Sequence, residues 1–138
     1  MTTEEIQKEN DVLKKENKSS DYELIGSGIS GNKIYDLYLR MEEDVLAKNP
    51  DIVVIYVGVN DVWHKTLLGT GTDADKFEKF YQAIIKKLKD RNIKVVLCTP
   101  ATIGEKNDNS NQQDGDLNQY SKIIRNLAAK NNLSLIDL

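Results

Sequence analysis

The 138-residue sequence contains a single cysteine, Cys98, and a single histidine, His64. One cysteine excludes a disulfide within these residues, and because Cys98 directly follows the apolar run Val95-Val96-Leu97 we expect a buried, unreactive thiol. One cysteine and one histidine also supply too few ligands for a Cys/His metal site. We therefore expect neither a metal nor another cofactor.

The sequence also lacks an excess of charge of either sign. Its 19 basic and 22 acidic residues give a net charge of -3, and no stripe of Lys or Arg would follow a phosphate backbone, which argues against a nucleic-acid partner. No run approaches the roughly 20 apolar residues of a membrane-spanning helix, and the opening MTTEEIQKEN lacks the basic and apolar regions of a secretory signal. As written, the sequence predicts a cytoplasmic protein, with secretion left open if it is part of a longer chain.

The length is sufficient for one domain with a hydrophobic core. Residues 3–17 are rich in helix formers, and Thr2 and Glu5 have the spacing of a capping box, but the segment contains few apolar residues (Ile6, Val12 and Leu13). We therefore assign residues 1–20 to a polar N-terminal helix or extension, solvated or forming a short coiled-coil contact, and residues 21–138 to one α/β domain.

From residue 22 onward, apolar runs typical of strands alternate with amphipathic runs typical of helices. Strands are predicted at 22–25, 51–58, 93–100 and 133–138, and helices at 32–48, from Thr72 or Asp73 to about 88, and 117–130. The polar stretch 104–116 is a candidate lid or a disordered surface loop. Strands alternating with helices predict parallel pairing with right-handed crossovers, hence a three-layer α/β/α sandwich.

Residues 26–31, GSGISG, have the G-x-G-x-x-G spacing associated with dinucleotide binding. That function also needs an acidic residue at the tip of the second strand, about 20 residues further on. Counting from Gly31 leads to Asp51, which stands at the beginning of the next predicted strand and so at the wrong edge of the sheet. A nucleotide-binding flavodoxin-like protein is therefore the least favoured of the three hypotheses considered.

The sequences GSGISGN and GVNDVW both follow predicted strands and are joined by one helix. In parallel α/β sheets ligands bind beyond the carboxyl ends of the strands, so both should face one crevice. There the backbone N–H of Gly28 and the side-chain N–H of Asn60 can be aimed at one oxygen atom, as in an oxyanion hole. The alternative is that both residues only permit tight strand-to-helix turns.

With these two motifs, VVLCTPATIGE and the closing LSLIDL, residues 24–138 resemble the SGNH hydrolases, also called GDSL-type esterases and lipases. The resemblance implies a flavodoxin-like parallel sheet and hydrolysis of a small acyl or acetyl ester through a serine nucleophile. It also implies a small-molecule or carbohydrate ester as ligand. It assigns the family's oxyanion-hole glycine to Gly28 and its asparagine to Asn60, while Asp61 is expected to brace the turn.

The sequence departs from the family pattern, because it has no Gly-Asp-Ser motif and no D-x-x-H motif near its end. Ser27 or Ser30 with His64 could form a substitute Ser/His pair, although turn and exposed-loop roles are the ordinary explanation for such residues. We therefore expect a fragment or a catalytically incomplete ester hydrolase module. The alternative is a non-catalytic ligand-binding or assembly module on the same fold.

No apolar strand precedes Tyr22, so the family's first, central strand is expected to be missing. Its loss would leave a gap of about 10 Å in the sheet, with unpaired backbone groups. The gap could be closed by pairing residues 22–26 directly with residues 52–57, or by a strand donated in a homo-oligomer or by another chain. The remaining possibility is that the sequence is part of a longer protein.

Overall fold

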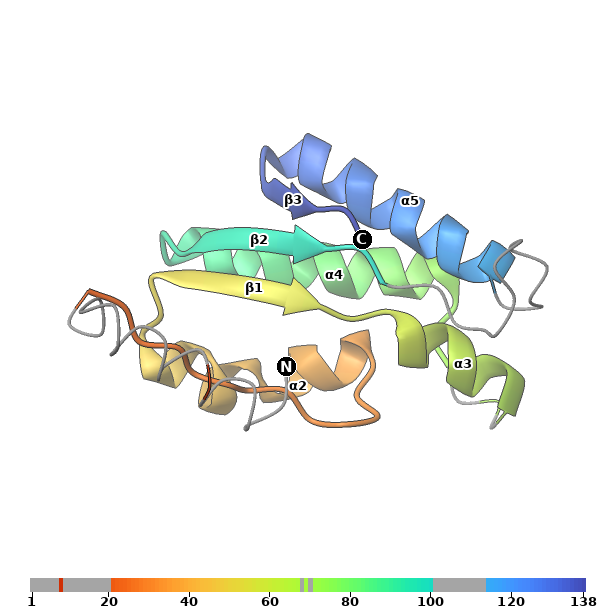
Figure 1. Ribbon diagram of the computed structural model, residues 1–138, viewed down its shortest axis with the longest axis horizontal. Helices are drawn as coiled ribbons and strands as arrows, with labels where there is room; N and C mark the ends of the chain where they lie inside the picture. Colours follow the sequence, from red (N-terminus) through yellow and green to blue (C-terminus); the bar gives the residue numbers. More distant parts are fainter. Residues whose placement is uncertain (1–7, 9–20, 68, 70, 101–113) are drawn as a thin grey trace. The chain divides into compact units, whose positions relative to one another are not determined.

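The computed structural model of the chain describes residues 8, 21–67, 69, 71–100 and 114–138. The chain divides into two compact units, Met1–Ser30 and Gly31–Leu138. The second unit contains three parallel strands and the helices that accompany them (Figure 1). The predicted helix at 3–17 lies outside the described residues except for residue 8, and most of the polar stretch 104–116 lies outside them too.

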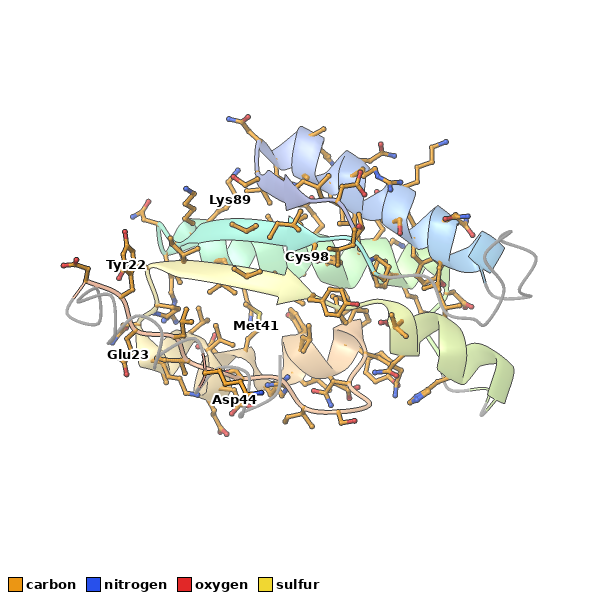
Figure 2. All side chains as sticks on the ribbon, in the orientation of Figure 1. Tyr22, Glu23, Met41, Asp44, Lys89 and Cys98 are labelled. Atoms are coloured by element: carbon orange, nitrogen blue, oxygen red, sulfur yellow. The ribbon has the colours of Figure 1, made fainter. Side chains whose placement is uncertain are left out.

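The sheet has the order β1-β2-β3, with β1 at Ile52–Tyr56, β2 at Lys94–Cys98 and β3 at Ser134–Ile136. Both pairings are parallel, with Tyr56 opposite Cys98 and Cys98 opposite Ile136. Cys98, at the end of β2, is 6% exposed, which confirms the buried thiol (Figure 2). The predicted α/β class with a parallel sheet is confirmed.

The helices α4 (Ala74–Asp90) and α5 (Asp114–Asn131) pack against β2, and α2 (Ile34–Asp44) packs against α4. Helix α4 forms where the sequence predicts it, because its apolar residues recur at helical spacing and create one buried face. That face consists of Phe77, Tyr81, Ile84, Ile85 and Leu88. Asp73 is the N-cap of α4, as one of the two predicted alternatives, but its side chain makes no capping hydrogen bond. No helix in the described part of the chain has the length and apolar character that crossing a membrane requires.

Two predicted elements differ from the structure. Residues 22–25 form no strand, and because they belong to the first unit their proposed pairing with β1 stays a prediction. Tyr22, Leu24 and Ile25 are all exposed there, and a segment that buries so little apolar surface gains nothing to offset the cost of ordering it. The helix predicted at 32–48 ends at Asp44 and is followed by the short 3-10 helix η1 (Leu46–Lys48), which Asn49 closes with a φ of 49°.

One helix was not predicted at all. Helix α3 (Val59–Leu67) follows β1 directly and includes Asn60, Asp61 and His64, which the sequence had suggested lie in a turn and a loop (Figure 1). Gly58 makes the connection with a φ of 132°, a conformation that side chains other than glycine's rarely adopt. Asn60 therefore lies in the first turn of a helix at the carboxyl end of the parallel strand β1.

Candidate active site

The start of α2 is joined to the first turn of α3 by hydrogen bonds from neighbouring residues. The side-chain N–H of Asn60 donates to the main-chain oxygen of Asn32 at 3.1 Å. The main-chain N–H of Ile34 donates to the Asp61 carboxylate, at 3.1 Å to Oδ1 and 3.3 Å to Oδ2. These bonds fix the orientation of the Asn60 carboxamide relative to α2.

Asp61 is fully buried, and its hydrogen bond to Ile34 confirms the predicted bracing role. Burial raises the pKa of the Asp61 carboxyl, while the Thr72 side chain, the Ile34 amide and the Lys33 charge counteract this effect. The main-chain oxygen of Asp61 also accepts a hydrogen bond from the N–H of Thr72 at 3.1 Å. Asp61 thus connects the start of α2, the start of α3 and the approach to α4.

A third contact runs from the Nζ of Lys33 to the Nδ1 of His64, at 3.3 Å. An ammonium group can only donate, so Nδ1 of a neutral His64 accepts and its proton resides on Nε2. The imidazole then has no free lone pair with which to take a proton from a serine. Its position in α3, half-buried and bonded to Lys33, also shows that the exposed-loop interpretation of His64 was wrong.

The residues from Asp61 to His64 have the D-x-x-H spacing that the family resemblance places near the end of the chain. Here the Asp61 carboxylate is engaged by Ile34 and the His64 ring by Lys33. The two side chains therefore brace α3 against α2, and this occurrence of the spacing does not provide an acid and base pair.

Ser27, Gly28 and Ser30 belong to the first unit, and Asn60 and His64 belong to the second. The convergence of Gly28 with Asn60, and of Ser30 with His64, therefore stays a prediction. The dinucleotide interpretation requires a strand that leads directly into the glycines, and residues 21–25 form none. Among the described residues no group of His, Cys, Asp and Glu side chains could hold a metal ion.

Sequence reasoning missed Asn32 and Lys33 as parts of this arrangement. Asn32 acts through its main-chain oxygen, which no residue type signals. Lys33 and His64 are separated by 31 positions in the sequence, so no local pattern signals their contact.

The sequence model of the GDSL-like lipase/acylhydrolase family matches residues 10–138. The chain belongs to this family. The membership confirms the resemblance drawn from the motifs around Gly28 and Asn60.

Two solved structures are similar to this chain. The crystal structure of the acetyl xylan esterase AlAXEase has a TM-score of 0.94 and 69% sequence identity, over 96% of this chain and 67% of that chain. The crystal structure of Axe2, an acetylxylan esterase from Geobacillus stearothermophilus, has a TM-score of 0.73 and 31% identity, over 80% of this chain and 51% of that chain.

Among curated proteins, an acetylxylan esterase from Geobacillus stearothermophilus is 31% identical over 121 residues. The match includes 83% of this chain and 53% of that protein. The GDSL-family chain thus spans about half the length of the curated relative that it matches.

Proposed function

We propose that this chain forms part of a carboxylic ester hydrolase that removes acetyl groups from xylan or xylo-oligosaccharides. The observation that carries the proposal is the 69% identity to an acetyl xylan esterase, which extends over 96% of the chain. Identity at this level over nearly the whole chain supports a shared substrate class as well as a shared fold.

In the proposed reaction Asn60 stabilises the negative charge that develops on the ester oxygen. A carboxamide carries two N–H bonds, and Asn60 uses one on the main-chain oxygen of Asn32. The second is available to donate to a substrate oxygen, from a group whose direction is already fixed. The backbone N–H of Gly28 is the other proposed donor.

The proposal can be tested in a hybrid enzyme in which this chain replaces the matching part of AlAXEase. We expect the hybrid to release acetate from acetylated xylo-oligosaccharides. Replacing Asn60→Ala in it should lower kcat by about 10²- to 10³-fold with little change in KM, because the lost bond forms mainly in the transition state. Asn118→Ala, an exposed position on α5, is the matched control.

A folded hybrid without activity would contradict the proposal and favour a non-catalytic ligand-binding module. Unchanged kcat in the Asn60→Ala hybrid would remove Asn60 from the reaction. For the isolated chain we predict negligible turnover of nitrophenyl acetate, because the family's Gly-Asp-Ser motif does not occur in the sequence. Robust hydrolysis that Ser30→Ala abolishes would contradict this prediction and support the Ser30 and His64 pair.

We also propose that another polypeptide packs against the sheet, as a second copy of the chain or as a strand-donating partner. Support comes from β1, which pairs within the described sheet with β2 alone. Its residues Ile52, Val54 and Tyr56 are each at least half exposed. A strand with an apolar, half-exposed face is typical of a surface that another chain covers.

A further inference from the structure

We propose that a groove between α2 and the start of α4 binds sugar units of the substrate next to the acetyl group. The inference rests on the proposed function, because it names a second part of the same substrate. The groove has a volume of about 340 Å³, near the lower end of the range of about 300–1,000 Å³ found for ligand sites. It is lined by Tyr35, Leu39, Gly71, Thr72, Asp73, Lys76 and Phe80.

Both walls of the groove are attached to the residue that follows Asn60. Tyr35 follows Ile34, whose N–H donates to the Asp61 carboxylate. Thr72, on the other wall, donates its N–H to the main-chain oxygen of Asp61. Because Asp61 follows Asn60 directly, these bonds tie both walls to the turn that carries Asn60, and we therefore place the adjoining sugar units of the substrate in this groove.

The apolar part of the groove is a pair of aromatic rings held in fixed orientations. The rings of Tyr35 and Phe80 have centroids 6.3 Å apart and planes inclined by 57°. The Nζ of Lys33 lies 5.2 Å from the Tyr35 ring centroid, and the Tyr38 ring packs edge-on against Phe80 at 5.6 Å. Such rings provide apolar contact area at a small entropic cost, which suits the C–H faces of a pyranose.

Leu39 and two charged side chains complete the lining. Leu39 is 77% exposed, which is unusual for a large apolar residue and extends the apolar surface of the groove. Asp73 makes no capping hydrogen bond, so its exposed carboxylate can accept from sugar hydroxyls. Lys76, three residues further along, supplies a donor on the same side of α4. The lining thus combines apolar rings with a few polar groups, as expected for an uncharged, hydroxyl-rich ring.

The test uses unacetylated xylotetraose, which the esterase reaction cannot consume. We expect saturable shifts of the backbone amide signals of Tyr35, Gly71 and Phe80 when the chain is titrated by NMR. Tyr35→Ala and Asp73→Asn should each weaken the affinity, the former by roughly tenfold. Tyr56→Ala, which removes an exposed tyrosine ring from the sheet, outside the groove, is the control and should leave the affinity unchanged.

Asp73 and Lys76 are exposed, so Asp73→Asn and Lys76→Ala test the groove even if Tyr35→Ala fails to fold. The proposal is overturned if xylotetraose at tens of millimolar causes no saturable shift in the groove, or if all three groove variants bind as the wild type does. Groove binding together with an inactive hybrid would contradict the esterase proposal alone. Acetate release by the hybrid without groove binding would contradict the subsite alone.

Discussion

Asp61 carries a carboxylate into the interior of the second unit, where its side chain is fully buried. Desolvation disfavours the charged form, and the hydrogen bond from Ile34 together with the nearby Lys33 charge favours it. Because the pKa is nevertheless raised, burial is the larger effect. Burying the charged Asp61 carboxylate therefore costs free energy, and the hydrogen bond that it accepts from the Ile34 N–H at the start of α2 offsets part of that cost.

This cost predicts a pH dependence of stability. A carboxyl whose pKa is raised on folding binds protons more readily in the folded state, so its contribution is present below the ordinary Asp pKa and is lost as pH rises through the raised value. We expect the free energy of unfolding of the wild type, relative to that of Asp61→Asn, to fall as pH rises from about 3 to 7. Urea unfolding at several pH values measures the difference.

Asp137 is a control for this prediction, because its pKa is shifted in the opposite direction to that of Asp61. Its carboxylate pairs with Arg125 at 2.8 Å, and this hydrogen bond lowers the pKa of Asp137. The pair therefore contributes stability above the ordinary Asp pKa and loses it as pH falls, so the wild type should lose stability relative to Asp137→Asn on acidification. The same direction of change for both variants would contradict this account of Asp61.

Two buried tyrosines, Tyr81 on α4 and Tyr120 on α5, differ in whether their hydroxyl groups make a hydrogen bond. Burial raises the pKa of Tyr81 well above its usual range, and its hydroxyl has no hydrogen-bond partner among the described residues. The Tyr120 hydroxyl instead donates to the main-chain oxygen of Thr72. We expect Tyr81→Phe to leave stability unchanged or raise it by up to about 1 kcal/mol, and Tyr120→Phe to lower it by about 1–3 kcal/mol. Denaturant unfolding of both variants measures this, and equal losses would contradict it.

At the scale of elements, a helix or strand was predicted correctly where the local pattern of apolar residues is enough to determine it. Helix α4 was predicted because Phe77, Tyr81 and Leu88 recur on one face, and β1 and β2 because of their continuous apolar runs. Helix α3 was missed because it is only 9 residues long, and bonds to α2 brace its first turn. Such contacts join residues 27 or 28 positions apart, which no local pattern records.

In the candidate site, likewise, local sequence predicts the position of Asn60 but not the orientation of its side chain. The position of Asn60 at the end of a parallel strand follows from the pattern of β1 and the glycine after it. Its orientation depends on a main-chain oxygen of Asn32, and main-chain groups are the same at every residue. Sequence reasoning can therefore locate such a residue but cannot say what aims it.

The β1–α3 connection depends on Gly58, and Gly31 provides a comparison. A Cβ at Gly58 would lie 3.3 Å from the Cγ of Pro100 and 3.6 Å from the ring of Phe77, whereas a Cβ at Gly31 would meet nothing within 4 Å. Both glycines have positive φ, so either alanine variant is strained by about 1–3 kcal/mol. We expect Gly58→Ala to lower the free energy of unfolding more than Gly31→Ala does, because only the Cβ at residue 58 meets neighbouring atoms. Equal costs would show that the contact with Pro100 relaxes freely.

At the scale of the molecule, the sheet is buried on one side and exposed on the other. Val95 and Leu97 of β2 are buried, while Ile52, Val54 and Tyr56 of β1 and Ile136 of β3 are 46–58% exposed. Tyr56 and Ile136 lie on either side of Cys98 in the register, and Cys98 itself is buried, so the exposed apolar side chains are concentrated on β1.

We predict that the isolated chain self-associates through this face, because covering it removes apolar area from water. Light scattering after size exclusion should give a mass above the 15.6 kDa of one chain, increasing with concentration. Val54→Lys places a charge in the middle of the exposed strand and should restore the mass of a single chain. Ala129→Lys adds the same charge at an exposed position on α5 and should leave the association intact. A wild-type chain that stays monomeric at all concentrations would exclude a second copy as the partner and leave a separate strand-donating polypeptide as the means of covering the sheet.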